Sequence, residues 1–72
     1  MPIFPPLGRY QHFKGGLYQV LDFARNSENQ EWQVIYRALY GEGGLWVRPL
    51  AMFVETIERE GTQMQRFALI ET

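Results

Sequence analysis

The stretch "LYQVLDFARNSENQEWQVIYRAL", residues 17–39, decides the fold of this chain. Residues 17–24 alternate between two faces that are both largely apolar, which is typical of a strand covered on both sides. The run at 25–31 is polar and contains turn-forming asparagine and serine residues. Residues 32–39 resume an alternation of β-branched and aromatic side chains. The stretch therefore predicts a β-hairpin.

Proline and glycine set the expected structure upstream of this hairpin. Residues 1–8 hold three of the four prolines, which predicts an extended or frayed arm, because proline neither donates to a ladder nor continues a helix. The glycines of "HFKGG" (12–16) predict a turn ahead of the first core strand. We therefore expect an arm over 1–8 and a single domain over 9–72.

Downstream, the three glycines of "YGEGG" (40–44) predict a turn, and "LWVR" (45–48) predicts a short strand that Pro49 closes. Residues 49–52 are expected to form one helical turn. The segment 53–60 has two interpretations, because its apolar residues fit either a helix over 49–60 or one strand of a hairpin. We favour a short turn followed by a hairpin, whose second strand covers 64–70.

Composition supports a small packed β domain. The chain has 72 residues, of which 46% are hydrophobic and 21% charged, so it is globular rather than disordered. Because it has no cysteine and one histidine, disulfides and Cys/His zinc sites are excluded, and stability must come from its many aromatic side chains. Short strands with glycine-rich turns predict an all-β fold with one short helical turn, a small SH3-like barrel of about five antiparallel strands.

Charge and hydropathy limit the expected partners. No stretch approaches the roughly 20 apolar residues of a membrane span, and the first ten residues do not resemble a signal peptide, so we expect a cytoplasmic protein without a membrane partner. The formal net charge of −1 gives no overall reason to expect DNA as a partner. A local basic patch remains compatible with this charge.

Three motifs occur in order along the chain: Y-x-H-F-K-G-G-x-Y-x-V (10–20), Y-R-A-L-Y-G (36–41) and G-x-W-V-R-P-L-x-M-F (44–53). Together they resemble a family of short bacterial proteins and domains catalogued only as a domain of unknown function. The likeness runs from about Gly8 to Phe67 and leaves out the proline-rich arm. It implies a small β-rich bacterial domain and supplies no activity, cofactor or catalytic residue.

His12 and Lys14 are the first candidates for a ligand site. A histidine titrates near neutral pH and a lysine is a mobile positive charge, so together they suit a general base and an anion clamp. The favoured alternative is structural, with His12 bonded to the backbone at the edge of the 12–16 turn. "KGG" lacks the glycine spacing of a phosphate loop, and the few hydroxyl side chains offer no evident nucleophile.

Glu55 is the carboxylate that the pattern places nearest the core. If 53–60 is a strand, Glu55 shares a face with Phe53 and Ile57 and is expected beside an arginine. Glu58 and Glu60 are expected to be solvated. A small enzyme using His12 and Glu55 is a third hypothesis, behind two non-catalytic ones.

The strongest candidate constellation mixes aromatic and guanidinium groups on two strands expected to be neighbours. Tyr36, Arg37 and Tyr40 belong to the first strand and its turn, and Trp46 and Arg48 to the second. If the strands pair, Tyr36 shares a face with Trp46, or Arg37 with Arg48. Such groups stack on bases and bind phosphates or carboxylates. The structural alternative makes Trp46 a core plug and pairs Arg48 with Glu55.

Two non-catalytic functions follow. The first is a binding module that presents Tyr10, Tyr36, Trp46 and Arg48 to a peptide, a single-stranded nucleic acid or a small anion, with no cofactor or metal. The second is a self-associating protein, a homodimer formed through strand edges, which the low charge of 32–40 favours. We rank the binding module first.

Overall fold

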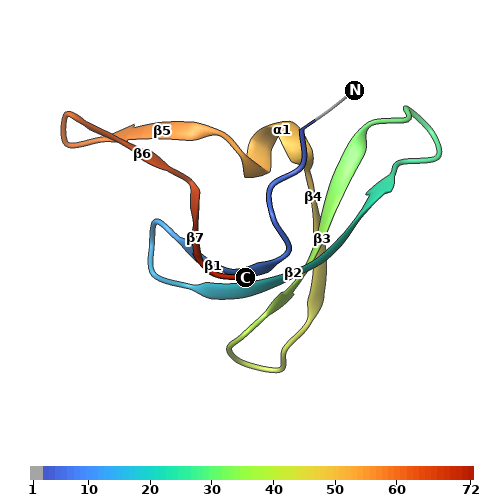
Figure 1. Cartoon of the computed structure of the whole chain (residues 1–72), viewed down its shortest axis with the longest axis horizontal. Helices are drawn as coiled ribbons and strands as arrows, with labels where there is room; N and C mark the ends of the chain where they lie inside the picture. Colours follow the sequence, from blue (N-terminus) through green and yellow to red (C-terminus); the bar gives the residue numbers. More distant parts are fainter. Residues whose placement is uncertain (1–2) are drawn as a thin grey trace.

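The computed structural model describes residues 3–72 and shows a curved antiparallel sheet with a small hairpin attached (Figure 1). The sheet has five strands in the order β4-β3-β2-β1-β7, and β5 and β6 form a separate two-stranded sheet. The elements are β1 (Gly8–His12), β2 (Leu17–Arg25), β3 (Trp32–Ala38), β4 (Leu45–Pro49), α1 (Leu50–Phe53), β5 (Thr56–Arg59), β6 (Thr62–Gln65) and β7 (Phe67–Glu71). The predicted all-β fold with one short helical turn is confirmed.

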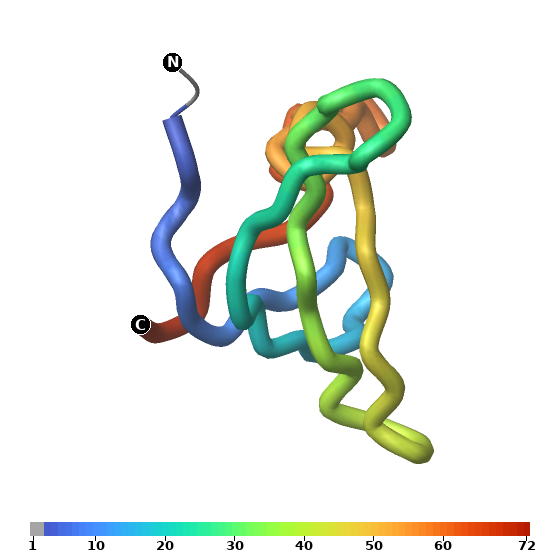
Figure 2. Tube along the Cα trace, turned by 90° about the vertical axis from the view of Figure 1, so that its right-hand side faces the viewer, coloured from blue at the N-terminus to red at the C-terminus, as the bar shows by residue number. Residues whose placement is uncertain are grey.

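The hairpin predicted over 17–39 is present as β2 and β3. Their register pairs Tyr18 with Ala38 and Phe23 with Val34, and shifts between Val20 and Asp22. In the connecting turn, the Oδ1 atom of Asn26 accepts a hydrogen bond from the Glu28 N–H at 2.8 Å. Figure 2 shows the two strands, teal and green, side by side next to their connecting turn, with β2 bending away from β3 further along. Polar side chains therefore build this turn, as the sequence indicates.

The sheet does not close into the barrel that the short strands suggested. β4 and β7 form its two edges and do not pair with each other. Helix α1 lies on the inner side of the curve (Figure 1), where Leu50 and Phe53 are buried. Because these two side chains cover the apolar inner face, the sheet buries its core without joining its edges.

The favoured interpretation of 49–60 is confirmed, since α1 ends at Phe53 and β5 pairs with β6. The expected strand over 64–70 is interrupted at Arg66. The Arg66 N–H donates to the Glu55 carbonyl at 3.0 Å, and the Arg66 carbonyl accepts from the Phe13 N–H at 2.9 Å. At Arg66 the chain therefore leaves the hairpin and joins the main sheet beside β1.

Strand β1 is the element that the sequence analysis missed. It lies between β2 and β7, and Gly8 permits the close approach: a Cβ there would lie 2.4 Å from the Glu71 carbonyl oxygen. Ahead of it, the arm packs its Phe4 ring against Phe23 and Trp32, with centroids 4.7 and 4.9 Å apart. Residues 1–2 of the expected arm lie outside the described residues.

The core is aromatic and lies between the inner face of the sheet and α1. Phe53 stacks on Phe67 with ring centroids 4.3 Å apart, and Tyr10 meets Phe53 edge-on at 5.2 Å. Val20 and Val34 complete it from β2 and β3. Within residues 3–72 no helix is long and apolar enough to cross a membrane.

Candidate functional site

Polar side chains from three strands meet around the buried ring of Phe67 on the inner face of the sheet. The His12 ring lies edge-on at a centroid distance of 4.9 Å, and the Tyr18 ring at 5.6 Å. The guanidinium carbon of Arg48 lies 5.4 Å from the same centroid. We call His12, Tyr18 and Arg48 the Phe67 cluster, and it combines a histidine, a phenol and a guanidinium group.

Strand register explains why these side chains converge. His12 is the cross-strand partner of Phe67, so β1 places the histidine beside the ring. Arg48 is the partner of the buried Val34, which fixes it on the inner face of β4. Tyr18, the second residue of β2, lies on the same face and also meets the Tyr36 ring edge-on at 5.2 Å.

Arg48 is the cluster's positive group without an acidic partner. Its Nε atom is buried and has no hydrogen-bond partner among the described residues. The ion pairs within residues 3–72 join Arg9 to Glu71 and Arg66 to Glu55, so neither includes Arg48. A guanidinium group held in this way suits an incoming phosphate or carboxylate, which accepts several N–H bonds at once.

His12 is held in one orientation by the 12–16 turn. Its Nδ1 atom accepts a hydrogen bond from the Lys14 backbone N–H at 3.1 Å, so in the neutral ring the proton is on Nε2. Burial lowers the pKa of His12 below its usual 6.5, and the charges of Arg48, Arg66 and Lys14 lower it further. The positive surroundings of His12 therefore favour an anion.

Two tyrosine hydroxyls form a polar rim next to the cluster. The hydroxyl oxygens of Tyr18 and Tyr40 are 2.6 Å apart. Burial is the largest cause and this hydrogen bond the second largest of the rise in the pKa of Tyr18 to about 12. Because one hydroxyl donates to the other, one of the two protons is left to donate to a ligand.

Trp46 extends the inner face toward the edge of the sheet. It pairs across the strands with Tyr36, so the expected shared face of these two residues is present. Trp46 is 59% exposed, which does not fit the alternative role of a core plug. It lies two residues from Arg48 on the same face of β4, about 7 Å along the strand.

Tyr10 and Tyr36, expected on a ligand-binding face, are core residues instead. Only 3% of Tyr10 and 5% of Tyr36 are exposed. The Tyr10 hydroxyl donates to the Pro6 carbonyl at 2.6 Å and so holds the arm. Sequence reasoning placed Tyr10 on the ligand-binding face because it missed β1, and Tyr36 faces the rings of Phe53 and Phe67.

Arg37 does not lie with the other residues of the expected aromatic and guanidinium site. Its partner across the strands is Leu45, whereas Arg48 pairs with Val34, so the two arginines lie on opposite faces of the sheet. The Nη1 atom of Arg37 donates to the Gly43 carbonyl at 2.6 Å. Arg37 therefore fastens the 40–44 turn on the outer side.

Glu55 is beside an arginine as expected, but that arginine is Arg66 and not Arg48. Their closest nitrogen and oxygen atoms are 2.6 Å apart. The hollow of about 310 Å³ that His12 lines, between the 12–16 turn and β6, does not include Glu55. Within residues 3–72 no three His, Cys, Asp or Glu side chains gather as a metal site. The geometry thus gives no support to a His12–Glu55 pair.

Sequence reasoning missed Arg66 and the role of Phe67. Arg66 contributes positive charge near His12, and Phe67 is the ring on which the cluster packs. The one available signal was an arginine inside the apolar run "MQRFALI" (64–70), a position where a charge requires a partner.

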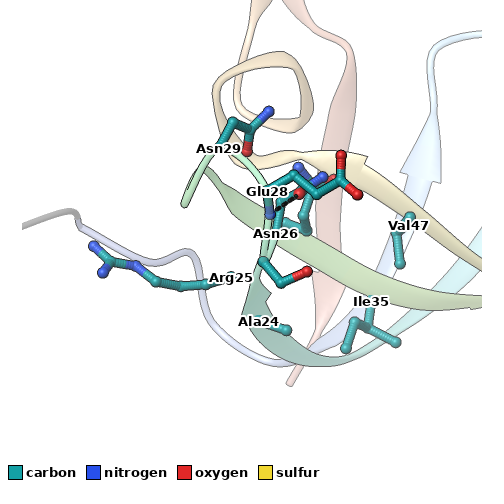
Figure 3. A pocket seen from close by; sticks show the side chains of 9 residues that line it. Ala24, Arg25, Asn26, Glu28, Asn29, Ile35 and Val47 are labelled. Atoms are coloured by element: carbon teal, nitrogen blue, oxygen red, sulfur yellow. Dashed lines mark hydrogen bonds between the residues drawn. The ribbon is translucent and has the colours of Figure 1, made fainter.

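A larger hollow lies elsewhere, against the β2–β3 turn (Figure 3). It measures about 480 Å³ and is open to solvent between the turn and the outer face near Ile35 and Val47. Figure 3 shows Arg25 pointing away from it, and this guanidinium lies 4.9 Å from the Trp32 ring centroid. Asn26 and Asn29 already use their Oδ1 atoms to build the turn. This hollow is therefore a product of the turn.

Comparison with known proteins identifies the family. The family model described as a protein of unknown function, DUF1653, matches residues 8–69. A crystal structure of a DUF1653 protein from Bordetella bronchiseptica is similar, with a TM-score of 0.83 and 34% sequence identity over 90% of this chain and 86% of that one. No curated protein matches the sequence. The match over nearly the whole of the sheet, together with this shared fold, shows that the chain belongs to the DUF1653 family.

Proposed function

We propose that the protein is a non-catalytic binding module that takes an organic anion with a planar ring, such as a nucleotide, on the inner face of its sheet. The proposal rests on the position of Arg48. Its guanidinium group lies over Phe67, and its buried Nε atom has no hydrogen-bond partner among residues 3–72. A charged donor group without an acceptor costs free energy, and a bound anion supplies an acceptor to this guanidinium group.

The Phe67 cluster and Trp46 bind different parts of the ligand. The anionic group lies at Arg48 and the Nε2–H of His12, beside the free hydroxyl proton of the Tyr18–Tyr40 pair. The planar ring stacks on Trp46, whose exposed indole is on the same face of β4. Stacking on an aromatic side chain contributes about 1–3 kcal/mol per base in single-strand binding.

The composition of the site favours binding over catalysis. Its side chains are arginine, histidine, tyrosine, tryptophan and phenylalanine, and the nearby Glu55 carboxylate is bonded to Arg66. A histidine needs a nucleophile or a positioned carboxylate to begin acyl or phosphoryl transfer. The groups gathered around Phe67 instead supply donors and flat surfaces.

The test is an NMR titration of the labelled protein with adenosine monophosphate. We expect saturable shifts of the Trp46 indole and of the amides of 12–16 and 46–48. The indole of Trp32, which packs against Phe4, serves as an internal control that stays in place. Inorganic phosphate, a short single-stranded RNA and an acidic peptide are titrated separately, and a response only to the peptide overturns the nucleotide-like ligand.

A matched pair of variants tests the role of Arg48. Arg48→Gln and Arg25→Gln each remove one arginine that lies over an aromatic ring, on Phe67 and Trp32 respectively. We expect Arg48→Gln to weaken binding at least tenfold and Arg25→Gln to leave it within about twofold, because a charged hydrogen bond is worth roughly 1.5–3 kcal/mol. Equal effects of both variants would show non-specific charge attraction.

A further inference from the structure

Strand β4 exposes three consecutive apolar residues at a free edge of the sheet. Leu45, Trp46 and Val47 are 56%, 59% and 63% exposed, and within residues 3–72 β4 has a partner strand on one side only. A hollow lined by these three residues and Ile35 continues the apolar surface onto β3. A free edge of this kind is a template for another strand.

The hydrogen bonds between β3 and β4 determine which backbone N–H and C=O groups of β4 are free to bond to another strand. The Ala38 N–H donates to the Gly44 carbonyl at 3.0 Å, so in the unbroken antiparallel register residues 44, 46 and 48 bond toward β3. Leu45 and Val47 consequently direct their N–H and C=O groups away from the sheet. These two residues present two donors and two acceptors in a row.

The opposite edge is built differently. The β1–β7 register shifts between Arg9 and Tyr10, and Arg9 forms an ion pair with Glu71 at 3.3 Å. Irregular pairing and charge protect an edge from further strands. Residues 45–47 have neither feature, because the β3–β4 register is unbroken and all three side chains are uncharged.

We propose that two copies of this chain pair through β4, antiparallel and centred on Trp46. In this register Leu45 of one copy faces Val47 of the other, and all the outward N–H and C=O groups of both residues are bonded. The apolar Leu45 and Val47 side chains meet on the outer face, and the two Trp46 side chains meet on the inner face. The inference does not rest on the proposed ligand.

Charge supports a second copy as the occupant. Arg48 is the one charged residue of β4, and in the centred register it faces Gly44 of the second copy rather than another arginine. The neighbouring 40–44 turn of that copy carries Glu42. The pairing therefore avoids a like-charge contact, which would destabilise a cross-strand pair.

Disulfide trapping tests this register, because the chain has no cysteine of its own. Trp46→Cys places the two thiols in a directly opposed pair with Cα atoms about 4.5 Å apart, within the range of a disulfide. Val47→Cys places each thiol opposite Leu45, too far from its symmetry mate. We expect Trp46→Cys to cross-link under mild oxidation and Val47→Cys to stay monomeric, and equal cross-linking of both contradicts the register.

Sedimentation equilibrium tests the association itself. We expect the wild-type mass to rise toward twice the monomer mass between roughly 10 μM and 1 mM, because one short strand pair makes a small interface. Leu45→Glu and Val47→Lys should each remain monomeric, and an equimolar mixture should form a heterodimer through the new ion pair. A wild-type protein that is monomeric at 1 mM overturns the proposal, as does a mixture that does not associate.

Discussion

Phe67 has two kinds of neighbour, and the contrast between them separates stability from binding. The apolar set of Phe53, Leu50, Tyr10 and Val34 is buried in the same core as Phe67, and Phe53 stacks on its ring. The Phe67 cluster of His12, Tyr18 and Arg48 touches the same ring with polar groups. The one polar side-chain group of the apolar set, the Tyr10 hydroxyl, is bonded to the Pro6 carbonyl, whereas the cluster keeps a buried Nε without a partner within residues 3–72.

The difference shows that one aromatic ring serves both purposes. Phe53 stacks on Phe67 with an interplanar angle of 8°, and close packing of this kind restricts the movement of the ring. A rigid ring fixes the guanidinium group of Arg48 before any ligand arrives, and preorganisation of this kind reduces the entropic cost of binding. Substitutions in the apolar set should therefore lower the free energy of unfolding, and substitutions in the cluster should lower affinity.

The largest expected effect comes from Phe53→Ala. Phe53 is 1% exposed, so its removal leaves a cavity against Phe67 and Tyr10. We expect the free energy of unfolding to fall by about 3–5 kcal/mol in urea denaturation. Met52→Ala, in the same helix but 43% exposed, is the matched control and should cost far less.

If Phe53→Ala proves unfolded, Phe53→Leu provides the measurement, because it removes less volume. A loss below about 1 kcal/mol in the alanine variant would mean that α1 does not carry the core. The division between the apolar set and the cluster would then fail.

Two of the elements that carry the apolar set, the β2–β3 hairpin and the short helical turn, were predictable from sequence patterns. The β2–β3 hairpin followed from period-2 alternation around a polar turn, and the short helical turn followed from Pro49. β1 was missed because its pattern is short and follows a proline-rich segment, while its pairing with β7 joins residues far apart in the sequence. Local patterns do not encode such pairings, so Tyr10 was assigned to the ligand-binding face instead of the core.

Arg48→Met is expected to change the free energy of unfolding less than Phe53→Ala does, and in the opposite direction. Methionine fills a similar volume without a buried donor, so the free energy of unfolding should stay unchanged or rise by up to about 1 kcal/mol. Binding of adenosine monophosphate should be lost in the same variant. A destabilisation above about 2 kcal/mol in urea would make Arg48 a structural residue and remove the contrast with Phe53.

The cluster was only partly predictable from the sequence. Pairing of β3 with β4 placed Trp46 opposite Tyr36, and this neighbourhood was anticipated. The separation of Arg37 from Arg48 depends on register, and a shift of β4 by one residue would have placed both arginines on one face. The position of Arg66 depends on the point where the chain passes from β6 to β7, which no local pattern marks.

The smallest effect concerns the pH dependence of stability through His12. Burial and the charges of Arg48, Arg66 and Lys14 lower the pKa of His12 below 6.5, so the unfolded chain binds its proton more readily than the folded one. The free energy of unfolding should therefore fall as the pH drops below 6.5, and the full penalty is present below the folded pKa. His12→Gln should remove this dependence at pH values above those where carboxylates titrate.

The same histidine reports on the ligand. NMR titration of the His12 ring in the wild type should give a pKa below 6.5, and Arg48→Met should raise it, because one of the opposing charges is gone. Saturating adenosine monophosphate should also raise it, since a phosphate beside Nε2 stabilises the protonated ring. A His12 pKa that responds to the Arg48 variant but not to the nucleotide would place the anion away from the Phe67 cluster while leaving the electrostatics of the cluster intact.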